Sequence, residues 1–198
     1  MLTSEEKGGI GVVLNEATLL GAEVDTASCV AAATLALFTL PESGPMPEDR
    51  RLQFRFESVD RVAASLRRGR WNDVTASVES FGIDELPKIV ESFGGLPVYG
   101  WDFIDQDADI AQWVDRCSFD WRCQNEHAVH SIRLFQEGPD RHLDLAIWFG
   151  DLRLLDADQN EVPLADVIAG GRRWWDAFHA KDPRTQGFGM FPLRRGAT

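Results

Sequence analysis

Three side chains capable of acid–base chemistry fall on one predicted β-hairpin, formed by residues 130–136 and 141–149. Alternation of apolar and polar residues places Arg133, His142 and Asp144 on the same face of this hairpin. A histidine beside a carboxylate can transfer protons, and an arginine can clamp an anionic substrate. A cross-strand ion pair of Arg133 and Asp144 beside a half-exposed histidine accounts for the same residues without catalysis, and we favour that interpretation.

Large aromatic residues on predicted strands could line a pocket around His142 and Asp144. They are Tyr99, Trp101, Trp121 and Trp148. Ligand pockets are mostly apolar and carry a few polar groups that orient the ligand. A small-ligand-binding protein, or an acid–base enzyme with this aromatic pocket, is therefore the alternative function.

The spacing of potential metal ligands does not favour a metal site. Side chains that zinc prefers lie close together in the sequence, at Cys117, Cys123, His127 and His130. They lack the short C-x2–4-C spacing that brings two thiolates together, and cysteine is often buried without a metal. The segment Asp156-x-Asp158-x-Asn160 has Glu161 where a calcium loop requires glycine. We predict no metal and no cofactor, and the common nucleophile and nucleotide-binding motifs do not occur.

The charge of the chain limits the partners it can bind. Its 20 Lys and Arg residues against 32 Asp and Glu give a net charge of -12. Proteins that bind duplex nucleic acid or anionic membranes by charge normally carry the opposite sign. The basic cluster Arg61, Arg67, Arg68 and Arg70 beside Trp71 is more simply explained by ion pairs with nearby carboxylates. We therefore predict no duplex nucleic acid and no membrane as partners.

Acidity combined with seven tryptophans favours recognition of a basic protein. Acidic surfaces speed association with basic partners, and large aromatic residues are typical interface anchors. In the segment Arg172-Arg173-Trp174-Trp175 we expect Trp174 to be exposed and Trp175 to face the core. The candidate binding residues are Trp174, Arg172, Arg173, Tyr99, Trp101, Trp148, His142 and Asp144.

We accordingly predict an acidic binding protein of the immunity or inhibitor type, rather than an enzyme, whose carboxylates form a docking zone. The same composition is compatible with two alternatives. The negative charge could serve only to keep the protein soluble. The chain could also be a subunit of a homo-oligomer that buries Trp174 and exposed strands.

Periodicity predicts the elements that hold these residues. Strands are expected at 17–25, 29–40, 51–57 extending through 66, 97–105, 119–123, 130–136, 141–149 and 152–155. The alanine content of 29–40 leaves that segment open between strand and helix. Helices are expected at 84–95, around 110–117 and at 164–180. The pair Gly170-Gly171 costs stability inside the last helix, so we expect it to permit close approach to a sheet.

The turn between the two hairpin arms determines which residues face each other. Gly138 and Pro139 suit the two central positions of a type II′ turn. This turn predicts that Arg133 lies opposite Asp144 and that Leu134 lies opposite Leu143. It also brings six apolar side chains to one face: Ile132, Leu134, Leu143, Leu145, Ile147 and Phe149.

Length and composition indicate one domain. A chain of 198 residues with 44% hydrophobic and 26% charged residues is an ordinary globular sequence. We predict a single α+β domain over 1–198, with a mostly antiparallel twisted sheet of about six to eight strands and about three helices mainly on one side. Residues 1–16 are expected to be a loose N-terminal segment, and 181–198 an irregular tail.

The cysteines and the N-terminal residues indicate the cellular compartment of the protein. The three cysteines are widely spaced and odd in number, which does not indicate a disulfide framework. The N-terminus lacks the pattern of a secretory signal, and the most apolar stretch is too short to span a bilayer. We therefore expect a reduced, cytoplasmic protein.

Overall fold

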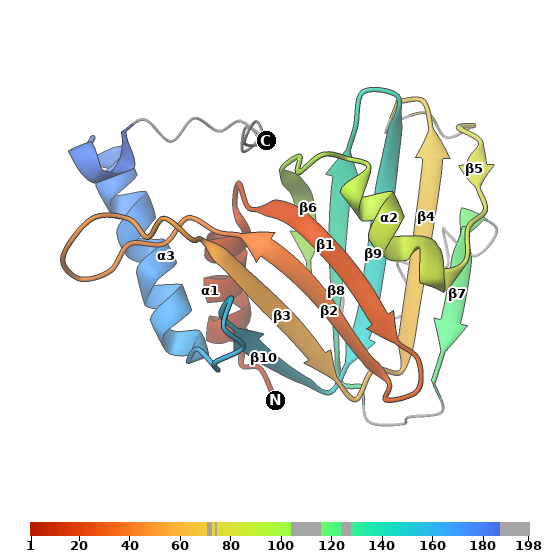
Figure 1. The fold of residues 1–198 in the computed structure, drawn as a ribbon, viewed down its shortest axis with the longest axis horizontal. Helices are drawn as coiled ribbons and strands as arrows, with labels where there is room; N and C mark the ends of the chain where they lie inside the picture. The colour runs from red at the N-terminus through yellow and green to blue at the C-terminus, as the bar shows by residue number, and fades with distance from the viewer. Residues whose placement is uncertain (71–72, 74, 104–115, 124–127, 187–198) are drawn as a thin grey trace.

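The fold is α+β, as predicted, but its strands form two antiparallel sheets rather than one (Figure 1). The computed structural model describes residues 1–70, 73, 75–103, 116–123 and 128–186, without the side chains of 99–102. Within these residues, no helix is both long and apolar enough to cross a membrane. The helix expected around 110–117 lies mostly outside the described residues.

The first sheet has four strands, and its order is β1-β2-β3-β10. Its strands are β1 (Thr18–Asp25), β2 (Val30–Ala36), β3 (Arg51–Glu57) and β10 (Asp151–Leu155). The alanine-rich segment that the sequence left open is therefore a strand. Its position between β1 and β3 explains this, because pairing on both sides and burial of Ala31 and Ala33 outweigh the helix propensity of alanine.

The second sheet has six strands, in the order β5-β4-β9-β8-β6, with β7 also paired to β4. Its strands are β4 (Arg61–Arg68), β5 (Val78–Glu79), β6 (Val98–Asp102), β7 (Phe119–Arg122), β8 (His130–Glu137) and β9 (Arg141–Phe149). The two sheets are connected directly by the β3–β4 and β9–β10 turns. Apolar side chains from both sheets, including Phe54, Phe56, Leu66 and Phe149, form one continuous core.

Helices α1 (Ser4–Leu14) and α3 (Leu164–His179) pack against each other beside the first sheet (Figure 1). The short α2 (Leu86–Glu91), which follows a 3-10 turn, contacts β1. Another 3-10 turn (Pro183–Thr185) follows α3 at the start of the expected tail, and residues 187–198 lie outside the described part.

The prediction of a loose N-terminal segment is wrong, because residues 4–14 form a capped helix. The side chain of Thr3 accepts a hydrogen bond from the Glu6 amide, and the Glu6 carboxylate accepts one from the Thr3 amide. This capping box supplies partners for the amides at the start of a helix. Ile10, Val13 and Leu14 are buried against the core, which holds the helix in place despite its three glycines.

The predicted register of the β8–β9 hairpin is wrong by two residues, but the predicted apolar face is confirmed. Arg133 lies opposite Ala146, and Leu134 opposite Leu145. The Gly138 amide donates to the Arg141 carbonyl, so Pro139 takes the first central position of the turn, where its fixed φ is favoured. A shift of two residues keeps every side chain on its face, since strand side chains alternate with period two.

A disulfide between Cys29 and Cys123 corrects the expectation of reduced cysteines. Cys29 lies in the β1–β2 turn of the first sheet, and Cys123 follows β7 of the second. Their Cα atoms are 6.2 Å apart, although 94 positions separate them in the sequence. The Cys29 carbonyl accepts from the Val59 amide, and the Cys123 amide donates to the Asp60 carbonyl. The bond therefore joins the two sheets at the β3–β4 turn, a proximity that the sequence spacing did not indicate.

Replacing both cysteines, Cys29→Ser with Cys123→Ser, should lower the free energy of unfolding by about 4–5 kcal/mol, because the crosslink closes a long loop in the unfolded chain. Urea unfolding with and without reductant measures this. Reductant should destabilise the original protein to the same extent and leave the double variant unchanged. Full alkylation of both thiols in the native protein without reductant would contradict the prediction.

Two glycines allow α3 to approach its neighbours, but not a sheet as predicted. A Cβ on Gly171 would lie 2.7 Å from Cγ2 of Val13 in α1, and one on Gly170 would lie 3.1 Å from Cβ of Thr39 in the β2–β3 connection. The first distance is shorter than any normal contact, so a side chain there would push the two helices apart. Both helices thus depend on the missing side chain of Gly171.

Gly171→Ala should destabilise the protein by about 1–2 kcal/mol, because overpacking against Val13 exceeds the gain in helix propensity. The matched control is Gly8→Ala in α1, where no atom lies within 4 Å of the added Cβ. That change should stabilise the protein by roughly 0.5–1 kcal/mol. Denaturant titration of the two variants tests the opposite signs, and equal effects would contradict the packing argument.

Candidate functional site

The predicted ion pair of Arg133 and Asp144 is present, and it includes a second arginine. Asp144 is completely buried, and it lies on the outer face of the second sheet, the face that points away from the main core. Nε and Nη2 of Arg133 donate to its Oδ1 at 2.9 and 2.6 Å, and Nη2 of Arg67 donates to its Oδ2. Arg67 comes from β4 and Arg133 from β8, so the carboxylate on the central strand β9 links three strands. Both of its oxygens are occupied by guanidinium groups.

His142 is buried rather than half-exposed as predicted, because it lies inside the sheet next to Arg67. Its Nδ1 lies 3.3 Å from the Gly69 carbonyl, which places a proton on Nδ1 and makes Nε2 the acceptor. Burial, together with the charge of Arg67, lowers the pKa of His142 below its usual 6.5. The imidazole is therefore neutral at pH 7, and its Nε2 has no hydrogen-bond partner among the described residues.

The aromatic pocket predicted around these residues does not form from its described members. Trp148 lies on the outer face, where the Arg61 guanidinium stacks 4.7 Å from its ring. Trp121 pairs with Val62 and packs against the main core on the opposite face of the sheet. The side chains of Tyr99 and Trp101 lie outside the described residues, so their part of the prediction is not tested.

Two of the four residues considered for zinc have other partners. Cys123 is in the disulfide, and Nε2 of buried His130 accepts from the Leu2 amide at 2.9 Å. Cys117 packs against Ala146, and His127 is not among the described residues. In the described part of the chain, no group of three or more His, Cys, Asp or Glu side chains could hold a metal ion.

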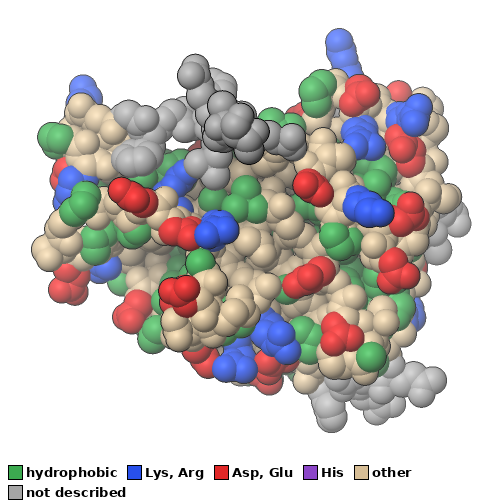
Figure 2. All heavy atoms as spheres, in the orientation of Figure 1, with side chains coloured by type: hydrophobic (Ala, Val, Ile, Leu, Met, Phe, Trp, Pro, Cys, Tyr) green, Lys and Arg blue, Asp and Glu red, His purple; other side chains and the backbone are tan. Residues whose placement is uncertain are grey.

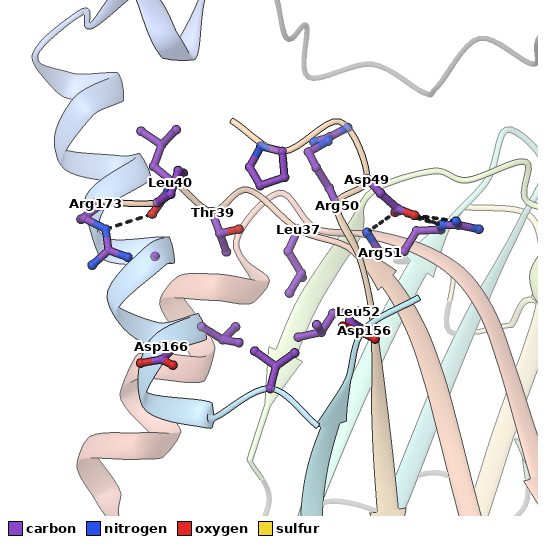
Figure 3. A pocket seen from close by; sticks show the side chains of 15 residues that line it. Leu37, Thr39, Leu40, Asp49, Arg50, Arg51, Leu52, Asp156, Asp166 and Arg173 are labelled. Atoms are coloured by element: carbon purple, nitrogen blue, oxygen red, sulfur yellow. Dashed lines mark hydrogen bonds and ion pairs between the residues drawn. The ribbon is translucent and has the colours of Figure 1, made fainter. Parts of the chain in front are cut away.

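A pocket of about 290 Å³ lies between the β2–β3 connection and α3, and the sequence did not indicate it (Figure 3). The start of β3 and the segment that joins β10 to α3 also line the pocket, which is open to solvent. Most of the exposed surface of its lining is apolar, and the apolar side chains that contribute to it are Leu37, Leu40, Pro41, Pro47, Leu52, Val162 and Val167. Ligand sites typically combine such a lining with a few polar groups.

The β2–β3 connection is attached to α3 by backbone and side-chain contacts. The Leu40 amide donates to the Gly170 carbonyl at 3.0 Å, and Nε of Arg173 donates to the Leu40 carbonyl at 2.9 Å (Figure 3). Close approach is possible because Gly170 has no side chain to meet Thr39. The connection thus forms one wall of the pocket, and α3 forms the facing wall.

Trp174 packs against the β2–β3 connection and is not exposed as predicted. Only 2% of its surface is accessible, because Phe38 and Met46 of the β2–β3 connection cover it. The rings of Trp174 and Phe38 lie 4.5 Å apart. Trp175 is half-buried instead of facing the core, and its Nε1 donates to the Val12 carbonyl of α1 at 3.1 Å. Arg172 is exposed outside the pocket, whereas Arg173 lines it.

The arginines of the pocket are already engaged by the protein. Arg51 binds Asp49 through Nε at 2.9 Å and Nη2 at 2.6 Å, and this pairing lowers the pKa of Asp49 to about 2. The Arg50 guanidinium lies 4.7 Å from the ring centre of Phe38, and Arg173 donates to a backbone carbonyl. Of the three, only Arg51 is paired with a carboxylate, and Arg50 and Arg173 keep their positive charge while they contact neutral groups.

Two carboxylates of the pocket have no cationic partner among the described residues, Asp156 after β10 and Asp166 in the first turn of α3. The amides of Asn160 and Asp158 donate to Oδ1 of Asp156 at 2.8 and 2.9 Å and lower its pKa, so this group is ionised at pH 7. Asp166 is exposed. The lining of the pocket therefore carries as many arginines as aspartates, and Asp156 and Asp166 are its two carboxylates without an ion pair in the described structure.

Comparison of the chain with protein-family models, curated proteins and solved structures found no match. A proposal about function therefore depends on the structure of the chain itself.

Asp144→Asn should destabilise the protein by about 3 kcal/mol, because two arginines would lose the charge that holds them together inside the sheet. The control is Glu161→Gln, which removes an exposed ion pair with Arg153 and should change stability little. Urea unfolding at pH 7 compares the two. Similar effects at both sites would show that the buried arrangement is not structural.

Proposed function

We propose that the chain is an acidic binding protein of the immunity or inhibitor type, and that it recognises a basic protein at the pocket between the β2–β3 connection and α3. One observation carries this proposal. The pocket is open and mostly apolar, and two of the carboxylates that line it, Asp156 and Asp166, have no ion-pair partner in the described structure. A basic group with an apolar body complements such a site.

Net charge and local charge have different parts in this proposal. On the face that Figure 2 shows, carboxylates are spread out with Lys and Arg among them and do not form the single docking zone expected from the sequence. The net charge of -12 can speed the approach of a basic partner without a patch, because it acts over several ångströms. Selection of a particular partner then depends on the pocket.

The alternative of a small-ligand protein or acid–base enzyme around His142 and Asp144 has less support. Both oxygens of Asp144 are bound by arginines, and neither Asp144 nor His142 has accessible surface. An acid–base group must reach the proton that it transfers. A structural ion pair accounts for this arrangement with fewer assumptions.

The cytoplasmic location expected from the sequence stays a prediction, and the disulfide argues against it. Disulfides persist mainly in oxidising compartments. The Cys29–Cys123 bond therefore favours a protein that works outside the reducing cytosol.

The proposal is tested by affinity capture from the source organism with two baits of equal charge. Asp156→Asn with Asp166→Asn alters the pocket, whereas Asp158→Asn with Asp176→Asn alters exposed carboxylates that do not line it. We expect the unaltered protein and the control to capture the same basic protein, and the pocket variant to lose at least tenfold in affinity. Binding should weaken as salt rises, because charge contributes to it.

Equal capture by both variants would contradict the proposal, as would a captured protein that is acidic. Melting temperatures of the two baits serve as the folding control. Asparagine at 156 keeps an oxygen that can accept from the amides of Asp158 and Asn160, so the turn should persist.

A further inference from the structure

We infer that a pH-sensitive latch holds the residues before α1 to the second sheet. The latch is the hydrogen bond from the Leu2 amide to Nε2 of His130, and it opens when the imidazole takes up a proton. The two atoms lie 2.9 Å apart, although the residues are 128 positions apart in the sequence. The inference does not rest on the proposed function.

The chemistry of the two partners makes the latch depend on protonation. A backbone amide can only donate, and a neutral imidazole has one nitrogen that accepts. A protonated imidazole has two donors, so Nε2 of a charged His130 would direct its proton at the proton of the Leu2 amide. Only 4% of the His130 surface is accessible, and burial disfavours a charged imidazole. The folded protein therefore holds the latch closed with a neutral His130, and acid favours the open form.

The surroundings of His130 fix the latch in place. Its ring lies 5.7 Å from the ring of Phe149, the residue opposite it in β9, and Leu2 packs against the main core. The charged groups on the described segments that meet there are Met1, Glu5, Glu6 and Lys7 at the N-terminus and Asp151 at the start of β10. An ordinary carboxylate titrates near about pH 4, and amino groups titrate at about pH 8 or above. Among these groups, His130 is the one that takes up a proton near pH 6.

The latch bears on α1 and, through it, on α3. Leu2 directly precedes the capping box of Thr3 and Glu6 that begins α1. Farther along this helix, the Val12 carbonyl accepts from Nε1 of Trp175 in α3 at 3.1 Å. Release of Leu2 should therefore loosen α1 from its first turn and change the surroundings of the Trp175 indole.

NMR spectroscopy of the full, unaltered chain tests the latch directly. At pH 7.5 we expect a scalar coupling across the hydrogen bond, between the Leu2 amide nitrogen and Nε2 of His130. The coupling should vanish as the pH falls below about 6.5, where an exposed histidine is half protonated. For a single proton, the ratio of open to closed form rises about tenfold for each pH unit. The lack of a coupling at pH 7.5 would overturn the inference, as would a coupling that persists after the ring carbons of His130 report protonation.

His130→Gln separates titration from packing, because its side-chain oxygen can accept from the Leu2 amide and takes up no proton near pH 6. Between pH 7.5 and 5.5, the melting temperature of the unaltered protein should fall by about 2–4 °C more than that of the variant. Buried His142 is present in both proteins, so its titration cancels in this difference. The matched control is His179→Gln, which removes an exposed histidine and should keep the full decrease.

The same decrease in the unaltered protein and in His130→Gln would contradict the latch. The Trp175 indole signal should shift with acid in the unaltered protein and not in this variant. An indole signal that stays unchanged while the coupling vanishes would overturn the extension to α3. Because the coupling is measured on the unaltered chain, it decides the inference even where His130→Gln does not fold.

Discussion

The close contact of α3 with α1 on one side and with the β2–β3 connection on the other determines where the pocket lies. Gly171 lets Val13 approach α3, and Gly170 lets Thr39 do so from the connection. The Leu40 amide and carbonyl then bond to α3, and Trp174 fills the space under Phe38. A side chain at either glycine would move one wall of the pocket, so its shape depends on helix packing as much as on its own lining.

The two sheets have different roles in this arrangement. The start of β3 in the first sheet and the segment that follows β10 line the pocket together with the β2–β3 connection and α3. The second sheet holds a buried polar layer in which Asp144 joins Arg67 and Arg133 from neighbouring strands. Burying such charges costs free energy, which the ion pairs offset without adding much stability. In the observed register the shared carboxylate of Asp144 links β9 to both β4 and β8.

The two charge clusters differ in a way that bears on the proposed function. In the second sheet a carboxylate is shared by two guanidinium groups inside the protein. In the pocket, Asp156 and Asp166 form no ion pair among the described residues, and Asp156 accepts hydrogen bonds only from the neutral amides of its own turn. A charge satisfied within the fold contributes to structure, whereas an ionised group at the edge of an apolar pocket is available to another molecule.

Local patterns in the sequence determined the strand periodicity, the α+β class and the faces of the β8–β9 hairpin, because these follow from chemistry repeated every two residues or every turn. The hairpin register was missed, since Gly138 and Pro139 allow two turns that differ by a shift preserving both faces. The capping box of Thr3 and Glu6 was a local signal that could have revealed α1. The disulfide, the burial of Trp174 and the pocket were decided by tertiary structure alone. Each joins segments far apart in the chain, and such proximity depends on how whole elements pack, which no short stretch of residues encodes.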